Sequence, residues 1–384
     1  MVGYYHLAQT GILKTASSPK ILIGSKELTQ LSLLIKQWGN ELGFQQVGIT
    51  DTDLITAETH LDNWIAKGFY GEMDYMQRHG LKRSHPELLH EGTVRVISVR
   101  MDYQSESSAQ MNRILGDPTA AYISRYALGR DYHKMMRNRL QKLADKIQSE
   151  VSKTLSYTDI NISMRGFVDS APVLEKALAE KAGLGWIGKH SNLINRKVGS
   201  WFFLGEIYIN LPLPVDEQTT AHCGDCTACL SICPTQAIVA PYQVDARRCV
   251  SYLTIELQGS IPEHLRPLIG NRIYGCDDCQ IICPWNRFAK MTAEADFNPR
   301  QQLNTQQLLT VFAWDEDTFL KKTEGSAIRR IGHERWLRNI AVALGNAPPS
   351  PQVIEALTDK LEQASDLVKE HLQWALTRQL SHLD

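Results

Sequence analysis

Eight cysteines, gathered mainly in two short runs, are the residues of this chain whose type and spacing most clearly predict chemistry. The first run, Cys223 to Pro234, reads C-x2-C-x2-C-x3-C-P, the ligand pattern of bacterial-type iron–sulfur ferredoxins. The second run, Cys276 to Pro284, repeats part of that pattern, and Cys249 stands alone between the two. Eight thiolates are the number that two four-iron clusters require. The sequence therefore predicts a protein that moves single electrons at low potential.

The same pattern predicts how the thiolates are shared. In two-cluster ferredoxins the last cysteine of each run ligates the other cluster. The expected ligand sets are Cys223, Cys226, Cys229 and Cys283 for one cluster, and Cys233, Cys249, Cys276 and Cys279 for the other.

Disulfides and zinc are the alternative uses of these cysteines. A disulfide framework usually belongs to a short chain in an oxidising compartment, and this chain has 384 residues. Zinc is the stronger alternative, because C-x2-C pairs are also zinc ligands. A zinc site does not need a third cysteine two residues further on and a closing C-P, so the spacing favours iron–sulfur clusters.

The composition limits the class of protein. The chain has 41 Lys plus Arg against 42 Asp plus Glu, so its net charge does not itself indicate a nucleic-acid partner, although a local basic face would suffice for one. The length predicts two or three domains. The first 20 residues lack a charged n-region, an apolar core and a twin-arginine pair, and no apolar stretch is long enough to span a bilayer. We expect a cytoplasmic protein with no membrane partner.

Hydrophobic periodicity predicts the elements that position this chemistry. Residues 1–26 show none and are interpreted as an extension. The alternation of helices and strands that follows predicts a catalytic α/β domain over 27–214. Its expected helices are 31–42, 54–66, 131–151 and 173–182, and its expected strands are 44–50, 95–103, 163–168 and 200–211.

The rest of the chain divides at the cysteines. We expect a ferredoxin-like two-cluster module over 215–290 and a helical region over 291–384. Apolar stripes beginning near Trp336, Val353 and Leu367 are short and separated by turn residues. They are compatible with a HEAT-like stack or with a plain helical cap.

Three further motifs give the chain a specific resemblance. They are GEMDYMQRHGLKR (71–83), YALGRDYH (126–133) and VDSAPVLEKALAEKAGLGWIGKHSNLI (168–194). Together with the double cysteine run, they resemble the epoxyqueuosine reductase family from about residue 27 to the end. The resemblance implies an oxidoreductase that uses cobalamin and two [4Fe-4S] clusters to remove the epoxide oxygen of epoxyqueuosine in a tRNA anticodon loop, giving queuosine and water. It also implies a cobalamin-binding core similar to that of reductive dehalogenases.

Asp169 matches the proton donor proposed for that family. The departing oxygen needs a proton in the transition state. A free aspartate, with a pKa of about 3.9, would be ionised at neutral pH. We expect burial against a corrin to raise the pKa of Asp169 and keep part of it protonated. The alternative is that Asp169 caps a helix that opens at Pro172.

The resemblance and the glycine-rich segment 183–192 predict where a planar cofactor is held, although such a segment is also an ordinary turn. His133, in Asp131-Tyr132-His133, starts a known cobalt-ligand motif, but Met136 stands where that motif has glycine, so we interpret His133 as a pocket or structural residue. The expected cofactor contacts are Arg83, Tyr132, Asp169, Gly188, Lys189, His190, Ser191, Asn192, Leu193 and Ser251.

Two sets of basic residues are candidate contacts for tRNA phosphates. They are Arg130, Lys134 and Arg137 in the first set, and Arg329, Arg330, Arg335 and Arg338 in the second. Within the second set, we predict that Arg330, Arg335 and Arg338 bind tRNA phosphates. We also expect a low-potential electron donor of unknown identity and a monomeric enzyme.

Two other functions fit part of the sequence. A cobalamin-dependent reductive dehalogenase would usually carry a twin-arginine signal, which this start lacks. A plain ferredoxin-type electron-transfer protein would leave Asp169 and the first domain without a role.

Overall fold

A computed structural model describes residues 24–154 and 161–381, so most of the predicted extension lies outside the described residues. A four-stranded antiparallel sheet forms the centre of the first domain, with strand order β1-β2-β7-β4. The strands are β1 (Gln46–Thr50), β2 (Arg95–Asp102), β4 (Met164–Phe167) and β7 (Phe202–Ile209). Because all neighbouring strands of this sheet pair antiparallel, the domain belongs to the α+β class. The α/β class is therefore wrong for it, because alternating helices and strands do not specify strand direction.

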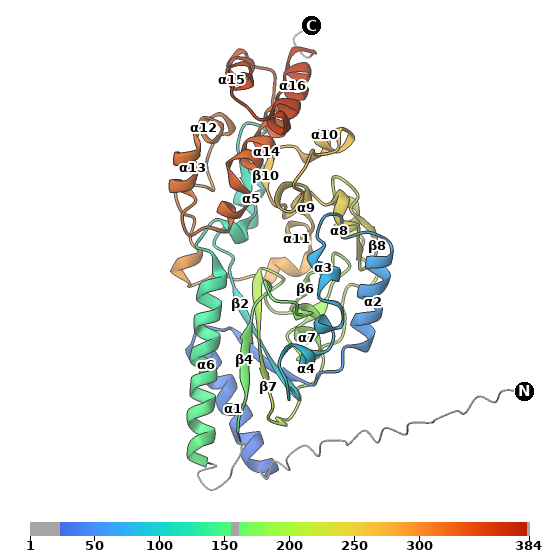
Figure 1. The fold of residues 1–384 in the computed structure, drawn as a ribbon, viewed down its shortest axis with the longest axis vertical. Helices are drawn as coiled ribbons and strands as arrows, with labels where there is room; N and C mark the ends of the chain where they lie inside the picture. The colour runs from blue at the N-terminus through green and yellow to red at the C-terminus, as the bar shows by residue number, and fades with distance from the viewer. Residues whose placement is uncertain (1–23, 155–160, 382–384) are drawn as a thin grey trace, which may run out of the picture.

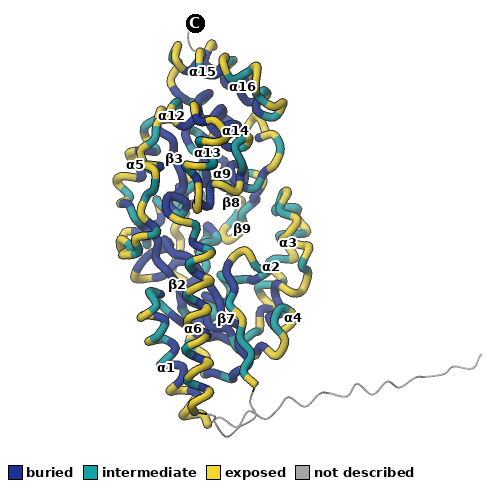
Figure 2. Tube along the Cα trace, turned by 60° about the vertical axis from the view of Figure 1, so that its left-hand side comes forward, coloured by how far each residue is buried: buried dark blue, intermediate teal, exposed yellow. Residues whose placement is uncertain are grey.

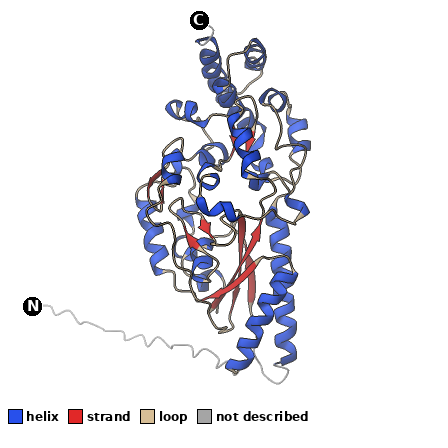
Figure 3. Cartoon of the chain, turned by 180° about the vertical axis from the view of Figure 1, so that it is seen from behind, coloured by secondary structure: helices blue, strands red, loops and turns tan. Residues whose placement is uncertain are grey.

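Helices cover both faces of this sheet (Figures 1 and 3). On one face, α1 (Ser25–Glu41) and α6 (Tyr132–Thr154) lie side by side and share a core with the sheet. On the other face lies α7 (Glu175–Lys181), which packs on β1, β2 and β7. Strand β7 is buried along its whole length as a result. The remaining helices of this part are α2 (Ile55–Ala66), α3 (Tyr75–Arg78), α4 (Pro86–Leu89) and α5 (Ser108–Gly116).

The glycine-rich segment forms a small hairpin, β5 (Trp186–Ile187) and β6 (Leu193–Ile194), beside this sheet. The cysteine module then follows as short helices and strands. They are α8 (Ala228–Ile232), β8 (Ile238–Ala240), β9 (Gln243–Val244), α9 (Val250–Ile255), α10 (Arg266–Ile269), β10 (Arg272–Tyr274) and α11 (Asp278–Ile281). Strand β10 pairs in parallel with β3 (Tyr122–Ile123), so the module is joined to the first part of the chain by backbone hydrogen bonds.

The C-terminal region is helical, as predicted, and forms the upper part of the molecule in Figure 1. Its helices are α12 (Leu308–Phe312), α13 (Glu316–Lys322), α14 (Gly332–Asn346), α15 (Pro351–Leu361) and α16 (Asp366–Ser381). Both α14 and α15 pack on α16. This single group of helices does not establish a HEAT-like stack, which requires successive helix pairs.

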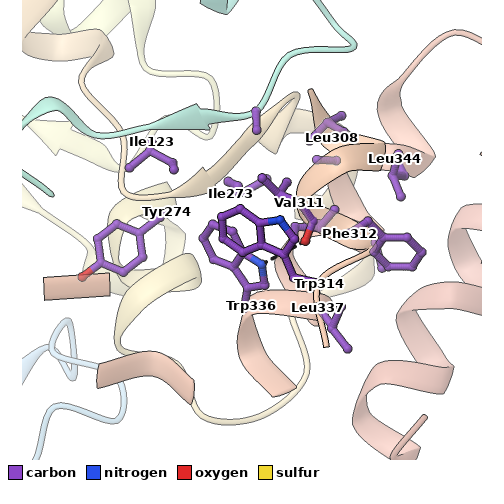
Figure 4. Close-up of a cluster of buried hydrophobic side chains, with 14 of the residues drawn as sticks. Ile123, Ile273, Tyr274, Leu308, Val311, Phe312, Trp314, Trp336, Leu337 and Leu344 are labelled. Atoms are coloured by element: carbon purple, nitrogen blue, oxygen red, sulfur yellow. Dashed lines mark hydrogen bonds between the residues drawn. The ribbon is translucent and has the colours of Figure 1, made fainter. Parts of the chain in front are cut away.

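One hydrophobic core runs from the C-terminal helices into the cysteine module (Figure 4). The rings of Trp314 and Trp336 stack at a centroid distance of 5.7 Å. Around them lie Ile273 and Tyr274 of β10 and Ile123 of β3. Figure 2 shows the same buried interior continuing through the upper half of the molecule. The core therefore crosses the predicted boundaries at residues 214 and 290. Among residues 24–154 and 161–381, no helix has both the length and the apolar composition to cross a bilayer.

Candidate active site

A cavity of about 410 Å³ lies where the first domain meets the cysteine module. The first domain contributes residues of β7, the start of α6, the loop before α7 and the β5–β6 hairpin. Further lining residues come from the cysteine module and from the 3-10 helix η7 (Ala327–Ile331). The cavity therefore joins segments that are far apart in the sequence.

One of the two predicted cysteine sets lines this cavity. Its members are Cys233, Cys249, Cys276 and Cys279. The thiols lie close enough for mutual electrostatic effects: burial raises the pKa of Cys279, and Cys249 and Cys233 raise it further. Four thiols on one wall are the donor set that a four-iron cluster requires.

The other set lines a separate cavity of about 40 Å³ nearer the surface. Its members are Cys223, Cys226, Cys229 and Cys283. Burial raises the pKa of Cys229 to about 11, with smaller contributions from the other three thiols. Cys226 is exposed, and His190 lines both cavities. The two predicted cysteine sets therefore line two cavities that share His190.

Asp277, inside the second cysteine run, links that run to the first domain through hydrogen bonds. Its buried carboxylate accepts hydrogen bonds from the Tyr122 hydroxyl (2.8 Å), the Ser124 hydroxyl (2.6 Å) and the Arg125 backbone N–H (2.9 Å). The Arg125 guanidinium is itself buried and paired with Glu106. The cysteines therefore hold their place through a buried polar network as well as through packing.

Asp169 lines the cavity from the loop before α7 and contacts two neighbouring residues of α6. His133 Nε2 is 2.7 Å from Asp169 Oδ1, and the Tyr132 hydroxyl donates to Asp169 Oδ2. His133 Nδ1 contacts Asp131 Oδ1 at 2.5 Å. Both ring nitrogens of His133 are therefore engaged by carboxylates, which fits its interpretation as a pocket residue.

The protonation of this pair differs from the expectation. Burial does raise the pKa of Asp169, but the hydrogen bond and charge of His133 and the hydrogen bond from Tyr132 outweigh burial, so the pKa is lowered. The pKa of His133 is raised to about 9, because its two carboxylate partners outweigh burial. At neutral pH the proton sits on His133, and Asp169 is ionised until a proton reaches it. The prediction that burial keeps Asp169 protonated is wrong for this state.

The alternative role of Asp169 as a helix cap does not fit the structure. Helix α7 begins at Glu175, and its N-cap residue is Leu174, with no side-chain cap. Asp169 lies five residues before that cap, and its carboxylate contacts α6 instead.

The structure brings seven of the ten predicted cofactor contacts to the cavity. They are Tyr132, Asp169, His190, Ser191, Asn192, Leu193 and Ser251. The His190 Nε2 is buried without a hydrogen-bond partner, and burial lowers the pKa of His190 to about 4. The side chain is therefore neutral at physiological pH.

Arg83, Gly188 and Lys189 do not line the cavity, contrary to the prediction. Arg83 is buried and donates to two backbone carbonyls before it, those of residues 75 and 76. Lys189 donates to the carbonyls of residues 224 and 226, beside the first cysteine set. Gly188 serves the hairpin, since an added Cβ would lie 2.4 Å from the side chain of Ile194.

Several cavity residues were not predicted. Glu175 and Lys176, within the recognised motif, line the cavity at the start of α7. Aromatic rings form another part of the wall: Tyr132 stacks on Phe203 at a centroid distance of 3.7 Å. Sequence spacing gave no signal for Phe203, because it occupies one position of a uniformly apolar strand.

The basic residues differ sharply in exposure. Arg338 is fully buried and donates to the carbonyls of Leu253, Leu257 and Gly259, so the prediction that it grips phosphate is wrong. Arg335 is half-buried and also donates to backbone carbonyls. The set that stays exposed is Arg130, Lys134, Arg137, Arg329 and Arg330.

These exposed cations come from two segments that meet beside the cavity. The backbone N–H of Asp131 donates to the carbonyl of Gly325 at 2.8 Å, which joins the start of α6 to the loop before η7. Arg330 lines the cavity and pairs with Glu256 at 2.9 Å, while Arg130 pairs with Asp296 at 3.0 Å. Lys134 and Arg137 face outward one turn further along α6.

Two family models match the chain. Residues 222–286 match a 4Fe-4S double cluster binding domain, and residues 83–170 match the model described as epoxyqueuosine reductase QueG, DUF1730. The curated epoxyqueuosine reductase of Escherichia coli K12 is 58% identical over 354 residues, 92% of this chain and 91% of that protein. The one from Pseudomonas aeruginosa is 58% identical over 350 residues, 91% and 94% of the two chains.

Solved structures show the same relationship. Epoxyqueuosine reductase from Streptococcus thermophilus is 26% identical with a TM-score of 0.77, and the match covers 92% of this chain and 91% of that one. An epoxyqueuosine reductase crystallised with an epoxyqueuosine-modified tRNA-Tyr stem loop is 25% identical, with a TM-score of 0.76 and coverage of 91% and 99%.

Proposed function

Because the chain belongs to the epoxyqueuosine reductase family, we propose that its central cavity is where the epoxide of epoxyqueuosine in tRNA loses its oxygen. Removing that oxygen as water leaves a carbon–carbon double bond and consumes two electrons and two protons. The observation that carries the proposal is that one cysteine set and Asp169 line the same cavity. Electrons and a proton can thus both reach a substrate bound in it.

Cobalamin is the cofactor that fits this cavity. Its corrin would collect electrons delivered singly by the clusters into the pair that the reaction needs. The stacked rings of Tyr132 and Phe203 form an apolar part of the cavity lining, and the second cysteine set forms another part of it. The unpartnered Nε2 of His190, with Ser191 and Asn192, offers hydrogen-bonding groups for the amide side chains of a corrin.

Asp169 delivers a proton to the departing oxygen, and His133 supplies it. The imidazolium is the protonated member of the pair at neutral pH and lies 2.7 Å from the carboxylate. As negative charge develops on the leaving oxygen, the proton passes from His133 to Asp169 and on to the oxygen. Tyr132 holds the carboxylate in place through its hydroxyl.

The substrate nucleoside has to leave the stack of the anticodon loop to enter a cavity of this kind. The exposed cations at the start of α6 and on η7 lie beside the cavity and suit the phosphates that flank such a base. This basic surface, defined here as Arg130, Lys134, Arg137, Arg329 and Arg330, replaces the predicted grip that included Arg335 and Arg338.

Cofactor content tests the proposal against the ferredoxin alternative. Protein prepared anaerobically and reconstituted with cobalamin is expected to hold about eight irons and eight sulfides per chain, with one corrinoid. Cys226→Ser and Cys279→Ser should each lose one cluster. Full clusters with no bound corrinoid would leave a ferredoxin-type protein, and stoichiometric zinc with negligible sulfide would remove both interpretations.

A further inference from the structure

Two protons are needed for each epoxide oxygen released as water, and the Asp169–His133 pair delivers one of them. The structure has two further acids in this region, one that lines the cavity and one buried beneath the adjoining helix. Glu175, the first residue of α7, lines the cavity, and Glu206 lies in the centre of β7 beneath α7. Neither carboxyl group has a part in the function described so far.

Glu206 is a charged residue type in an unusual place. It pairs across the sheet with Ser98 of β2 and Phe167 of β4, and its side chain is fully buried. Neither carboxyl oxygen has a hydrogen-bond partner within the described part of the chain. An ionised carboxylate in that position would be strongly disfavoured, so the group is expected to be a neutral acid.

The direction of the side chain follows from the alternation of β7. Residues 202, 204, 206 and 208 share one face of the strand. On that face, Phe202 and Leu204 pack with Ala179 of α7, and Tyr208 packs with Leu178. Glu206 therefore lies under α7, behind the cavity wall that Glu175 forms.

Burial, with a smaller contribution from neighbouring carboxylates, raises the pKa of both acids. Burial raises the pKa of Glu206, and Glu175 and Asp169 raise it further. Burial likewise raises the pKa of Glu175, with a further contribution from Asp169 that outweighs the opposing effects of Lys176 and His133.

The other titratable groups that face this site also come from several elements. Burial lowers the pKa of Lys176 on α7 and of His190 on the hairpin. Tyr208 lies on the same face of β7, and burial raises its pKa. None of these groups supplies a fixed positive charge close enough to hold either glutamate ionised.

We propose that Glu175 donates the second proton of the reaction and that Glu206 is the buried acid that reprotonates it. This inference rests on the proposed function. The Glu175 O–H bond breaks as the second O–H bond of the departing water forms, and the two electrons come through the cysteine sets. Glu206 then gives its proton to Glu175, and both acids are restored from solvent through the open cavity. The two carboxyl groups are not hydrogen bonded to each other, so this transfer uses one bridging water or a rotation of Glu175.

Infrared spectroscopy and kinetics on the reconstituted enzyme test the relay together. The wild-type protein at neutral pH should show carbonyl bands of protonated carboxylic acids, one lost in Glu175→Gln and another in Glu206→Gln. Turnover on epoxyqueuosine-containing tRNA should fall about 10²-fold in Glu175→Gln, the usual scale for a lost general acid. In Glu206→Gln it should fall less, because Glu175 can still take a proton from solvent through the cavity that it lines. KM for the tRNA and cofactor content should stay unchanged, and Glu206→Asp should restore part of the rate.

Tyr208→Phe is the matched control, because it also changes a buried, unpartnered polar group on the same face of β7. It should leave turnover and the acid bands unchanged. Absence of a Glu206 band in the wild-type protein overturns the relay, and so does an unaltered rate in Glu206→Gln. If Glu206→Gln does not hold its clusters, the wild-type band and the kinetics of Glu206→Asp decide. A wild-type enzyme with both acid bands but no activity on the tRNA would instead overturn the proposed function.

Discussion

The Nε2 of His133 lies 2.7 Å from Oδ1 of Asp169, and this contact places the proton of the pair on the histidine. The pKa of Asp169 is lowered, so in the proposed mechanism Asp169 becomes an acid only when the imidazolium passes its proton on. The second carboxylate partner of His133, Asp131, fixes the ring in the orientation that makes this transfer possible.

Replacing the carboxylate at this position tests its part in proton delivery. Asp169→Asn keeps the shape of the side chain but cannot carry the proton, so turnover should fall about 10²-fold or more. Cluster content should stay near that of the wild-type enzyme, because Asp169 is not among the cysteine sets. Corrinoid content should stay near it too, because asparagine has the same shape. Unchanged turnover in a correctly loaded variant would show that the proton comes from elsewhere.

The pH dependence of turnover should report His133. Its pKa in the folded protein is about 9, above the ordinary value of 6.5. His133 therefore keeps its proton in the folded protein until the pH rises through about 9. The stabilisation that this proton gives is complete below about pH 6.5 and is lost over the same rise. We expect the wild-type rate to fall over that upper range. His133→Asn should be slower and should lose this descending limb; a limb that persists in the variant would assign it to another group.

The cobalt spectrum is a separate test of the same histidine. Because both ring nitrogens of His133 contact carboxylates, we expect the Co(II) state of the reconstituted protein to show no splitting from an axial nitrogen. His133→Ala should leave that spectrum unchanged. Nitrogen splitting that disappears in this variant would mean that His133 binds cobalt.

Asp277 should be needed for the cluster expected at the central cavity and not for the cluster expected on the other cysteine set. Asp277→Ala removes a buried acceptor of three hydrogen bonds and leaves Arg125 without one of its acidic neighbours. Losing one member of such a buried ionic network costs about 3–5 kcal/mol. The variant should therefore retain about half of its iron. Asp225→Ala, an exposed aspartate in the first cysteine run, is the control and should retain all of it; equal iron in the two variants would argue against the anchoring role.

The basic surface beside the cavity predicts how salt affects tRNA binding. Each cation that neutralises a phosphate contributes somewhat under one unit to the log–log slope of affinity against salt. Changing Lys134 and Arg137 to Gln should flatten that slope and weaken binding, mostly at low salt. The matched double change of Lys142 and Lys146, further along α6, should alter neither. Equal slopes for the two double variants would place the phosphate contacts elsewhere.

The sequence predicted the elements better than their arrangement. The spans expected for the main helices and strands fall within a few residues of α1, α2, α6, α7 and the four sheet strands, because apolar periodicity is a local property. Strand direction depends on partners that are distant in the sequence. Periodicity carries no information about it, and this is why the α/β class was wrong.

Individual side chains show the same limit. The cysteine spacing predicted two sets of four, and each set lines one cavity in the structure. Arg338 looked like one member of a surface cluster, but it is buried because its partners are carbonyls about 80 residues away. Glu206 could be noticed in the sequence as a single acid in the middle of an apolar strand. Only the structure shows that its carboxyl group has no hydrogen-bond partner among the described residues.

The most direct test of the account is conversion of epoxyqueuosine to queuosine in tRNA taken from cells that lack this activity. The enzyme would be reconstituted anaerobically, supplied with a low-potential reductant, and assayed with and without cobalamin. The account predicts that queuosine forms only when cobalamin and both clusters are present, and that Cys279→Ser and Asp169→Asn each abolish or sharply reduce its formation. Full conversion without cobalamin, or with Cys279→Ser lacking its cluster, would contradict it.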